Sequence, residues 1–193
     1  MKILKFLPKI PYGSNTYVVE NAGIGILVDP SVSISDIGDK LEGVKIKYIV
    51  ITHAHFDHFL TLEEWQTKTN ATVFTGALDI PSLSDSFFNC YRPFLGIDKG
   101  YHGEVKPLNE GDVIYLGKEK ICVIHTPGHT KGAIALISSV GVIVGDTVFA
   151  EGGIGRTDLP GGNYGELLNS IAKIKSLPTG TTIYPGHGRE TSV

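Results

Sequence analysis

The 193-residue chain has the size of one domain and can bury a large core without disulfides. Its hydrophobic fraction of 41% and charged fraction of 19% are typical of a globular protein and exclude intrinsic disorder. The 17 Lys and Arg residues against 20 Asp and Glu give a net charge of -3 without any basic run, which argues against a nucleic-acid or anionic-membrane partner. We expect a single domain over residues 1–193.

The cysteines, the N-terminal segment and the longest uncharged run together predict a cytoplasmic protein. Cys90 and Cys122 lie far apart and form no paired motif, as expected in a reducing compartment. A lysine and a proline interrupt the apolar opening of the chain, which makes it a poor signal peptide. The longest uncharged run, between Lys131 and Asp146, is too short to span a bilayer. Nothing in the sequence indicates the oligomeric state.

Short apolar runs rich in β-branched residues and bounded by turn residues predict strands along most of the chain. We expect them at residues 2–6, 15–20, 23–29, 46–52, 71–76 and 181–186, with three more between 104 and 126 and a hairpin over 133–145.

Capping residues and apolar spacing predict three helices. Ser33 with Asp36, and Thr61 with Glu64, have the spacing of a capping box, so a helix is expected to begin at each place. A third helix is expected to begin near Asn163, where apolar residues recur at helical spacing. Its inward face is expected to consist of Leu167, Leu168, Ile171 and Ile174.

Residues 77–103 show no clear period but contain five aromatic residues. These aromatics suit either a lid over an apolar part of a substrate or an insertion that packs against the domain. The five are Phe87, Phe88, Tyr91, Phe94 and Tyr101.

Seven residues of metal-binding type follow the predicted strands. Four of them come directly after the strand at 46–52, and the other three each follow a different strand. The seven are His53, His55, Asp57, His58, His129, Asp146 and His187. Because the ends of buried strands meet at a common edge, we expect these side chains to lie close together. The alternative is that these residues bind no metal and form a polar, hydrogen-bonded rim. Such a rim does not require seven residues of metal-binding type.

The types and spacing of these residues favour two ions. Imidazole and carboxylate groups suit zinc, with iron or manganese as alternatives. Seven ligands exceed one tetrahedral shell and match two divalent ions, between which Asp146 is the natural bridge. In an extended segment His53, His55 and Asp57 would point the same way, and His58 would point elsewhere.

The segments THAHFDH, HTPGHTKG, GDTVF and YPGHG, in this order, resemble the motifs of the metallo-β-lactamase-fold superfamily over essentially the whole chain. The resemblance implies an α/β (α+β) fold, a four-layer αβ/βα sandwich with a two-metal site at the edge of the sheets. It implies one ion on His53, His55 and His129, and a second on Asp57, His58 and His187, with Asp146 between them.

The loop GDTVFAEGGIGRTDLPGG is similar to the glyoxalase II (hydroxyacylglutathione hydrolase) and persulfide dioxygenase branch. The resemblance implies that Arg156 binds a carboxylate of the substrate, whereas an ion pair with Asp158 in the same loop is the alternative. Asp158 itself departs from the tyrosine of glyoxalase II, and the usual helical extension does not follow His187. The chain is therefore more similar to short, single-domain glyoxalase-II-like hydrolases.

Two chemistries are compatible with this resemblance. The first is hydrolysis of an acyl-thiol, a small-molecule thioester, by a hydroxide shared between two ions about 3.5 Å apart, with Asp57 as a catalytic residue that orients the hydroxide. The second is a mononuclear iron persulfide dioxygenase, which the GRTD sequence favours and the YPGHGRET ending disfavours. Of the remaining histidines, His125 is expected to orient its neighbours and His102 to lie on the surface.

Overall fold

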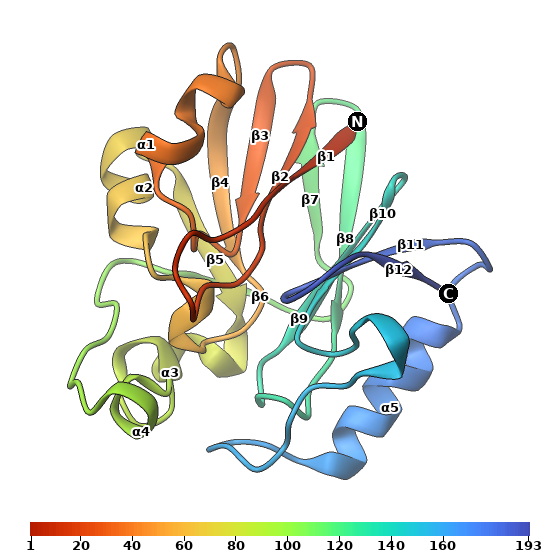
Figure 1. The fold of residues 1–193 in the computed structure, drawn as a ribbon. Coiled ribbons are helices and arrows are strands. Elements are labelled where there is room, and N and C mark those ends of the chain that lie inside the picture. Colours follow the sequence, from red (N-terminus) through yellow and green to blue (C-terminus); the bar gives the residue numbers. More distant parts are fainter.

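The computed structural model describes residues 1–193 and contains two mixed six-stranded sheets that pack face to face (Figure 1). The first sheet has the order β1-β2-β3-β4-β5-β6, and the second has the order β12-β11-β10-β9-β8-β7. The strands of the first sheet are β1 (Lys2–Phe6), β2 (Thr16–Asn21), β3 (Ile24–Val28), β4 (Lys45–Ile51), β5 (Thr72–Gly76) and β6 (Lys106–Leu108). Those of the second are β7 (Val113–Leu116), β8 (Glu119–His125), β9 (Ile134–Ser138), β10 (Gly141–Gly145), β11 (Thr182–Pro185) and β12 (Thr191–Ser192).

The strand directions follow from the connections. Strands β1, β2 and β3 follow one another without a helix between them and pair antiparallel. Strands β3 to β6 are parallel because helical segments return the chain between them. In the second sheet only β10 and β11 are parallel, and α5 connects them. The helices are α1 (Ile34–Ile37), α2 (Leu62–Thr69), α3 (Ile80–Ser84), α4 (Tyr91–Leu95) and α5 (Tyr164–Lys175), with 3₁₀ turns η1 (Gly38–Leu41), η2 (Phe56–His58), η3 (Ala77–Asp79) and η4 (Ala150–Gly152).

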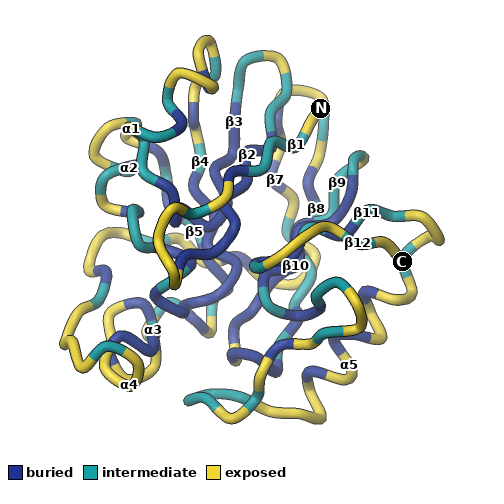
Figure 2. The backbone as a smooth tube through the Cα atoms, viewed as in Figure 1, coloured by how far each residue is buried: buried dark blue, intermediate teal, exposed yellow.

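Three apolar clusters define the four layers. The central cluster lies between the sheets, where Ile26 and Val50 of the first sheet meet Val123 and Leu136 of the second. A second cluster joins the outer face of the first sheet to α1, α2, α3 and α4, and its largest buried side chain is Trp65. A third joins α5 to the outer face of the second sheet. The buried parts of the chain accordingly follow the sheets, as Figure 2 shows. The expected αβ/βα sandwich is confirmed.

The strands predicted at 2–6, 15–20, 23–29, 46–52, 71–76 and 181–186 begin and end within one residue of those observed. The sequence did not reveal β12, a two-residue edge strand. No helix in the structure has the length and apolar character needed to cross a membrane.

The capping boxes predicted for two helices do not form. Ser33 and Thr61 do precede α1 and α2, but neither side chain caps its helix. The Thr61 hydroxyl instead donates to the carbonyl oxygen of Pro30 at 2.9 Å, because the β3–α1 connection lies against this end of α2. The Ser33 hydroxyl donates to the Asp36 carboxylate at 3.1 Å. The Thr61 hydroxyl therefore fastens a loop, and the Ser33 hydroxyl bonds to a side chain of the first turn of α1 instead of to a backbone amide.

Residues 77–103 are more regular than the sequence suggests, since they contain η3, α3 and α4. Tyr91 and Tyr101 are buried in the core beside α2, whereas Phe87 and Phe94 are about half exposed. The segment thus contributes both to the core and to the surface near the ends of the strands.

The inward face of α5 was predicted wrongly at one position. Leu167, Ile171 and Ile174 are buried, but Leu168 is 46% exposed. Positions 167 and 168 differ by 100° around the helix axis, and the sheet covers only the stripe that continues through positions 171 and 174.

This difference gives a test of the packing on α5. The change Leu167→Ala removes a side chain that is fully buried against the second sheet, so the free energy of unfolding should fall by about 2–5 kcal/mol. The neighbouring change Leu168→Ala should alter it by no more than about 0.5 kcal/mol. Urea unfolding followed by circular dichroism measures both. Equal losses in the two variants would contradict the burial of Leu167 and the exposure of Leu168.

Candidate metal centre

The four-residue donor cluster after β4 is shaped by a change of backbone conformation. His55 is extended and Phe56–His58 form the 3₁₀ turn η2. Alternation of side chains therefore ends at His55, and the prediction that Asp57 would point with His53 and His55 is wrong. The turn instead directs Asp57 and His58 toward His187.

All seven predicted ligands lie together at the edge where the two sheets meet. Their ligand atoms form three groups, each within 4.8 Å: His53 with His55 and His129; His53 with His58 and Asp146; and Asp57 with His58 and His187. The first and third groups match the two ion sites expected from the sequence.

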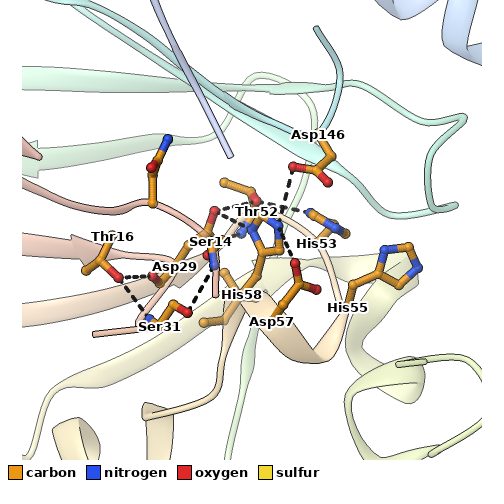
Figure 3. Close-up of polar contacts among 12 residues, drawn as sticks. Ser14, Thr16, Asp29, Ser31, Thr52, His53, His55, Asp57, His58 and Asp146 are labelled. Carbon is orange, nitrogen blue, oxygen red and sulfur yellow. Dashed lines mark hydrogen bonds and ion pairs between the residues drawn. The ribbon is translucent and has the colours of Figure 1, made fainter. Parts of the chain in front are cut away.

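Asp146 lies between these two groups. It directly follows β10, and its carboxylate oxygens lie 3.4 Å from Nε2 of His58 and 3.6 Å from Nε2 of His129 and of His187. Figure 3 shows His58 between Asp146 and Asp57. The position of Asp146 is therefore compatible with a ligand shared by two ions.

Two of the three histidines in the first group are uncharged. Burial lowers the pKa of His53 well below its ordinary value and lowers that of His55 to about 3, and the neighbouring imidazoles add to both effects. Nδ1 of His129 donates to the carbonyl oxygen of Arg156 at 2.7 Å, which leaves Nε2 facing His55 at 2.8 Å. Neutral imidazoles oriented in this way have lone pairs available for a metal ion.

The second group attracts positive charge. Burial alone would lower the pKa of His58, but the carboxylates of Asp29, Asp146 and Asp57 raise it well above its ordinary value. Burial alone would likewise raise the pKa of Asp146 and of Asp57, but His58 holds both below the ordinary value. The hydrogen bond to Asp57, against the effect of burial, raises the pKa of His187. Carboxylates that favour a proton here equally favour a metal cation.

The residues fit a metal centre by an independent criterion. Nε2 of His53 and of His55 are buried and have no hydrogen-bond partner. Nε2 of His58 and Oδ1 of Asp146 are also buried and form no hydrogen bond of good geometry, although they lie 3.4 Å apart. A buried polar atom without a partner costs about 1–3 kcal/mol of stability. Several such atoms converging on one place would therefore destabilise the fold considerably if nothing bound there. Imidazole and carboxylate donors without thiolate suit zinc, iron or manganese.

Asp29 is a residue of the centre that the sequence interpretation missed. It follows β3 and is fully buried, and its carboxylate accepts hydrogen bonds from Nδ1 of His58 at 2.9 Å and from the hydroxyl and amide of Thr52 at 2.8 and 2.7 Å. Asp29 thereby orients the His58 ring (Figure 3). The sequence did contain a sign of this role, because Asp29 stands at the end of an apolar strand, as Asp146 does.

His187 is held in place from the opposite sheet. Nδ2 of Asn15 and the hydroxyl of Tyr17, at the start of β2, donate to the carbonyl oxygen of Pro185 at 2.9 and 2.6 Å, and the amide of Asn15 donates to that of Gly186 at 2.7 Å. The loop that carries His187 is therefore attached to the N-terminal part of the chain.

The other two histidines have different surroundings. His102 is exposed, as predicted. His125 ends β8, and a turn separates it from His129. Its Nε2 has no hydrogen-bond partner. The orienting role expected for His125 thus has no support, because its side chain does not hydrogen-bond to the centre.

A cavity of about 210 Å³ opens onto the ligands. Phe56, Phe94 and Leu159 form an apolar wall, and Arg156 supplies the only cationic side chain apart from the histidines. Nε and Nη2 of Arg156 donate to the carboxylate of Asp158 at 2.7 and 2.6 Å, so the ion pair within the loop does form. The guanidinium also lies 5.7 Å from the ring centroid of Phe94.

Comparison with known proteins agrees with this geometry. A model of the metallo-beta-lactamase superfamily matches residues 10–187. The chain therefore belongs to the metallo-β-lactamase superfamily. The probable metallo-hydrolase YqgX of Bacillus subtilis is 33% identical over 97% of this chain and 90% of that protein.

Two solved structures are similar over nearly their whole length. The BLEG-1 B3 metallo-β-lactamase has a TM-score of 0.90 at 28% identity, covering 99% of this chain and 94% of that one. TTHA1623, determined in a di-iron-bound form, has a TM-score of 0.83 at 30% identity, covering 96% and 93%.

The place of Asp146 between the two ligand groups can be tested by metal content. The change Asp146→Asn removes the charge of the shared carboxylate, so the purified protein should lose about one of two metal equivalents per chain. Elemental analysis of protein exchanged into metal-free buffer measures this content. Asp158→Asn, which changes an exposed carboxylate outside the centre, is the matched control and should keep both ions. Two ions retained in Asp146→Asn would rule out the bridging position.

Proposed function

We propose that the protein is a cytoplasmic, binuclear zinc hydrolase that cleaves small-molecule thioesters. The observation that carries this proposal is a seven-ligand cluster at the base of a cavity with both an apolar wall and an arginine. Divalent ions at such a cluster would lower the pKa of a water molecule toward neutrality and would polarise a carbonyl group. Iron is the alternative metal, since the similar protein TTHA1623 was determined in a di-iron-bound form.

Asp57 is proposed to orient the attacking water. Its carboxylate lines the cavity and lies 3.1 Å from Nε2 of His187. His58 keeps the pKa of Asp57 below its ordinary value despite burial, so the carboxylate is ionised and accepts a hydrogen bond at neutral pH. A water molecule held by Asp57 would face a carbonyl carbon placed at the base of the cavity.

The rest of the cavity suits the two ends of an acyl-thiol. Phe56 and Leu159 would pack against the acyl group, and the volume of about 210 Å³ favours a small one. The guanidinium of Arg156 would bind a carboxylate of the thiol carrier through paired hydrogen bonds. Because Arg156 is paired with Asp158, this carboxylate would replace or share an existing partner.

Release of free thiol tests the reaction. Zinc-loaded protein should release thiol from S-lactoylglutathione or from short acyl thioesters, and metal-free protein should not, because the attacking water is then not activated. A thiol-reactive dye measures the rate. The absence of thiol release from S-lactoylglutathione and from all of the short acyl thioesters would contradict the proposal. One iron per chain together with oxygen consumption on glutathione persulfide would support the dioxygenase alternative instead.

The contribution of Arg156 can be separated from catalysis. Arg156→Gln should raise KM for a thioester that carries a carboxylate by about 10-fold, because a charged hydrogen bond is lost, and should leave kcat nearly unchanged. A neutral thioester with the same acyl group should be hydrolysed equally well by both forms. Arg189→Gln is the matched control, since Arg189 is exposed and pairs with Glu151. An unchanged KM for both substrates would remove Arg156 from the binding site.

A further inference from the structure

Asp79 is a buried carboxylate outside the ligand set. It ends the 3₁₀ turn η3 after β5 and is only 1% exposed. No lysine or arginine pairs with it. A buried carboxylate without a cationic partner requires strong hydrogen bonding, and Asp79 receives three hydrogen bonds.

The three donors come from the two loops that carry the three-histidine group. Oδ2 of Asp79 accepts from the amide of Ala54 at 2.9 Å and from the hydroxyl of Thr130 at 2.7 Å, and Oδ1 accepts from the amide of Gly132 at 2.7 Å. Ala54 stands between His53 and His55, and Thr130 directly follows His129. One carboxylate therefore joins the chain segments that carry all three imidazoles.

The packing around this carboxylate requires a glycine. A Cβ atom at Gly132 would lie 2.3 Å from the amide nitrogen of Asp79 and 2.8 Å from its Oδ1. The loop that follows His129 can thus approach η3 only because position 132 has no side chain. Two features of the chain, a buried acid and a glycine opposite it, serve the same contact.

We propose that Asp79 is a positioning residue that fixes the spacing of His53, His55 and His129 and thereby sets the metal affinity of the three-histidine group. Its hydrogen bonds reach the backbone between His53 and His55 and the loop after His129, and none of them reaches η2, which carries Asp57, or the loop that carries His187. The inference rests on the metal-binding role of the cluster, whereas the thioester substrate does not enter it.

Asp79→Asn tests this role. An amide presents a nitrogen in place of one carboxylate oxygen, so at least one of the three donors loses its acceptor. The zinc affinity of one site should fall about 10- to 100-fold, and the affinity of the other should stay at its wild-type value. Competition of the metal-free protein with a chromophoric chelator measures both affinities. A failure of thioester hydrolysis would leave this result unaffected, since the assay reads zinc binding alone.

Two changes at Thr130 test the hydrogen bond from its hydroxyl to Asp79 separately. Thr130→Ser keeps the hydroxyl and should bind zinc as the wild type does, whereas Thr130→Val keeps the shape, loses the donor and should weaken the same site as Asp79→Asn. Leu83→Ala is the control for stability, because Leu83 is buried in the same segment but is separate from the ligand loops. It should lower the urea midpoint without changing either zinc affinity.

A background variant identifies the affected site. In protein that already carries His129→Ala, the three-histidine group is incomplete, so adding Asp79→Asn should cause no further loss of zinc affinity. The proposal is overturned by wild-type affinity in Asp79→Asn, by equal weakening of both sites, or by a further loss in the His129→Ala background. A wild-type protein that binds no zinc would overturn it as well.

Discussion

The structure depends on the balance of charge around His58. This imidazole is fully buried, and three carboxylates from three different strand ends, those of Asp29, Asp57 and Asp146, face it. Each carboxylate would be unfavourable in the interior without the cation, and the cation would be unfavourable without them. The two sheets meet at this edge, and His58 there joins Asp29, which follows a strand of the first sheet, to Asp146, which follows a strand of the second. Positive charge, whether a proton or a metal ion, is thus a structural component of the fold.

Much of this arrangement could be predicted from the sequence, because buried strands and their polar ends are local patterns. Runs of β-branched residues identified the strands, and the His and Asp residues after four of them predicted ligand-type side chains that the structure brings together. The features that were predicted wrongly or missed depend mostly on contacts between segments far apart in the sequence. The exposure of Leu168 is decided by which stripe of α5 the sheet covers, and the roles of Asp29 and Asp79 are decided by loops that the sequence does not show together. The conformation of η2 was also missed, since alternation at His53 and His55 gives no sign of the turn that follows.

The two halves of the centre differ in physical character. The three-histidine group is buried, which lowers the pKa of His53 and His55, and its backbone is hydrogen-bonded to Asp79. The other group is more open, with 39% of the His187 side chain exposed, and contains the carboxylates. Ions held in a buried half and in a more accessible half that carries the carboxylates would differ in affinity and exchange rate. Such an inequality suits a centre in which one ion is permanent while the surroundings of the other rearrange around a substrate.

The attachment of the His187 loop to Asn15 and Tyr17 has a consequence for biosynthesis. The last ligand is held by residues made near the beginning of the chain, and β11, which precedes it, joins the sheet next to β10. A nascent chain on the ribosome can therefore bring the three-histidine group together before residues 182–187 are made, whereas the second group cannot form without them. Uptake of the second ion would then follow uptake of the first, and a chain that stopped before residue 187 would lack a ligand of the second group.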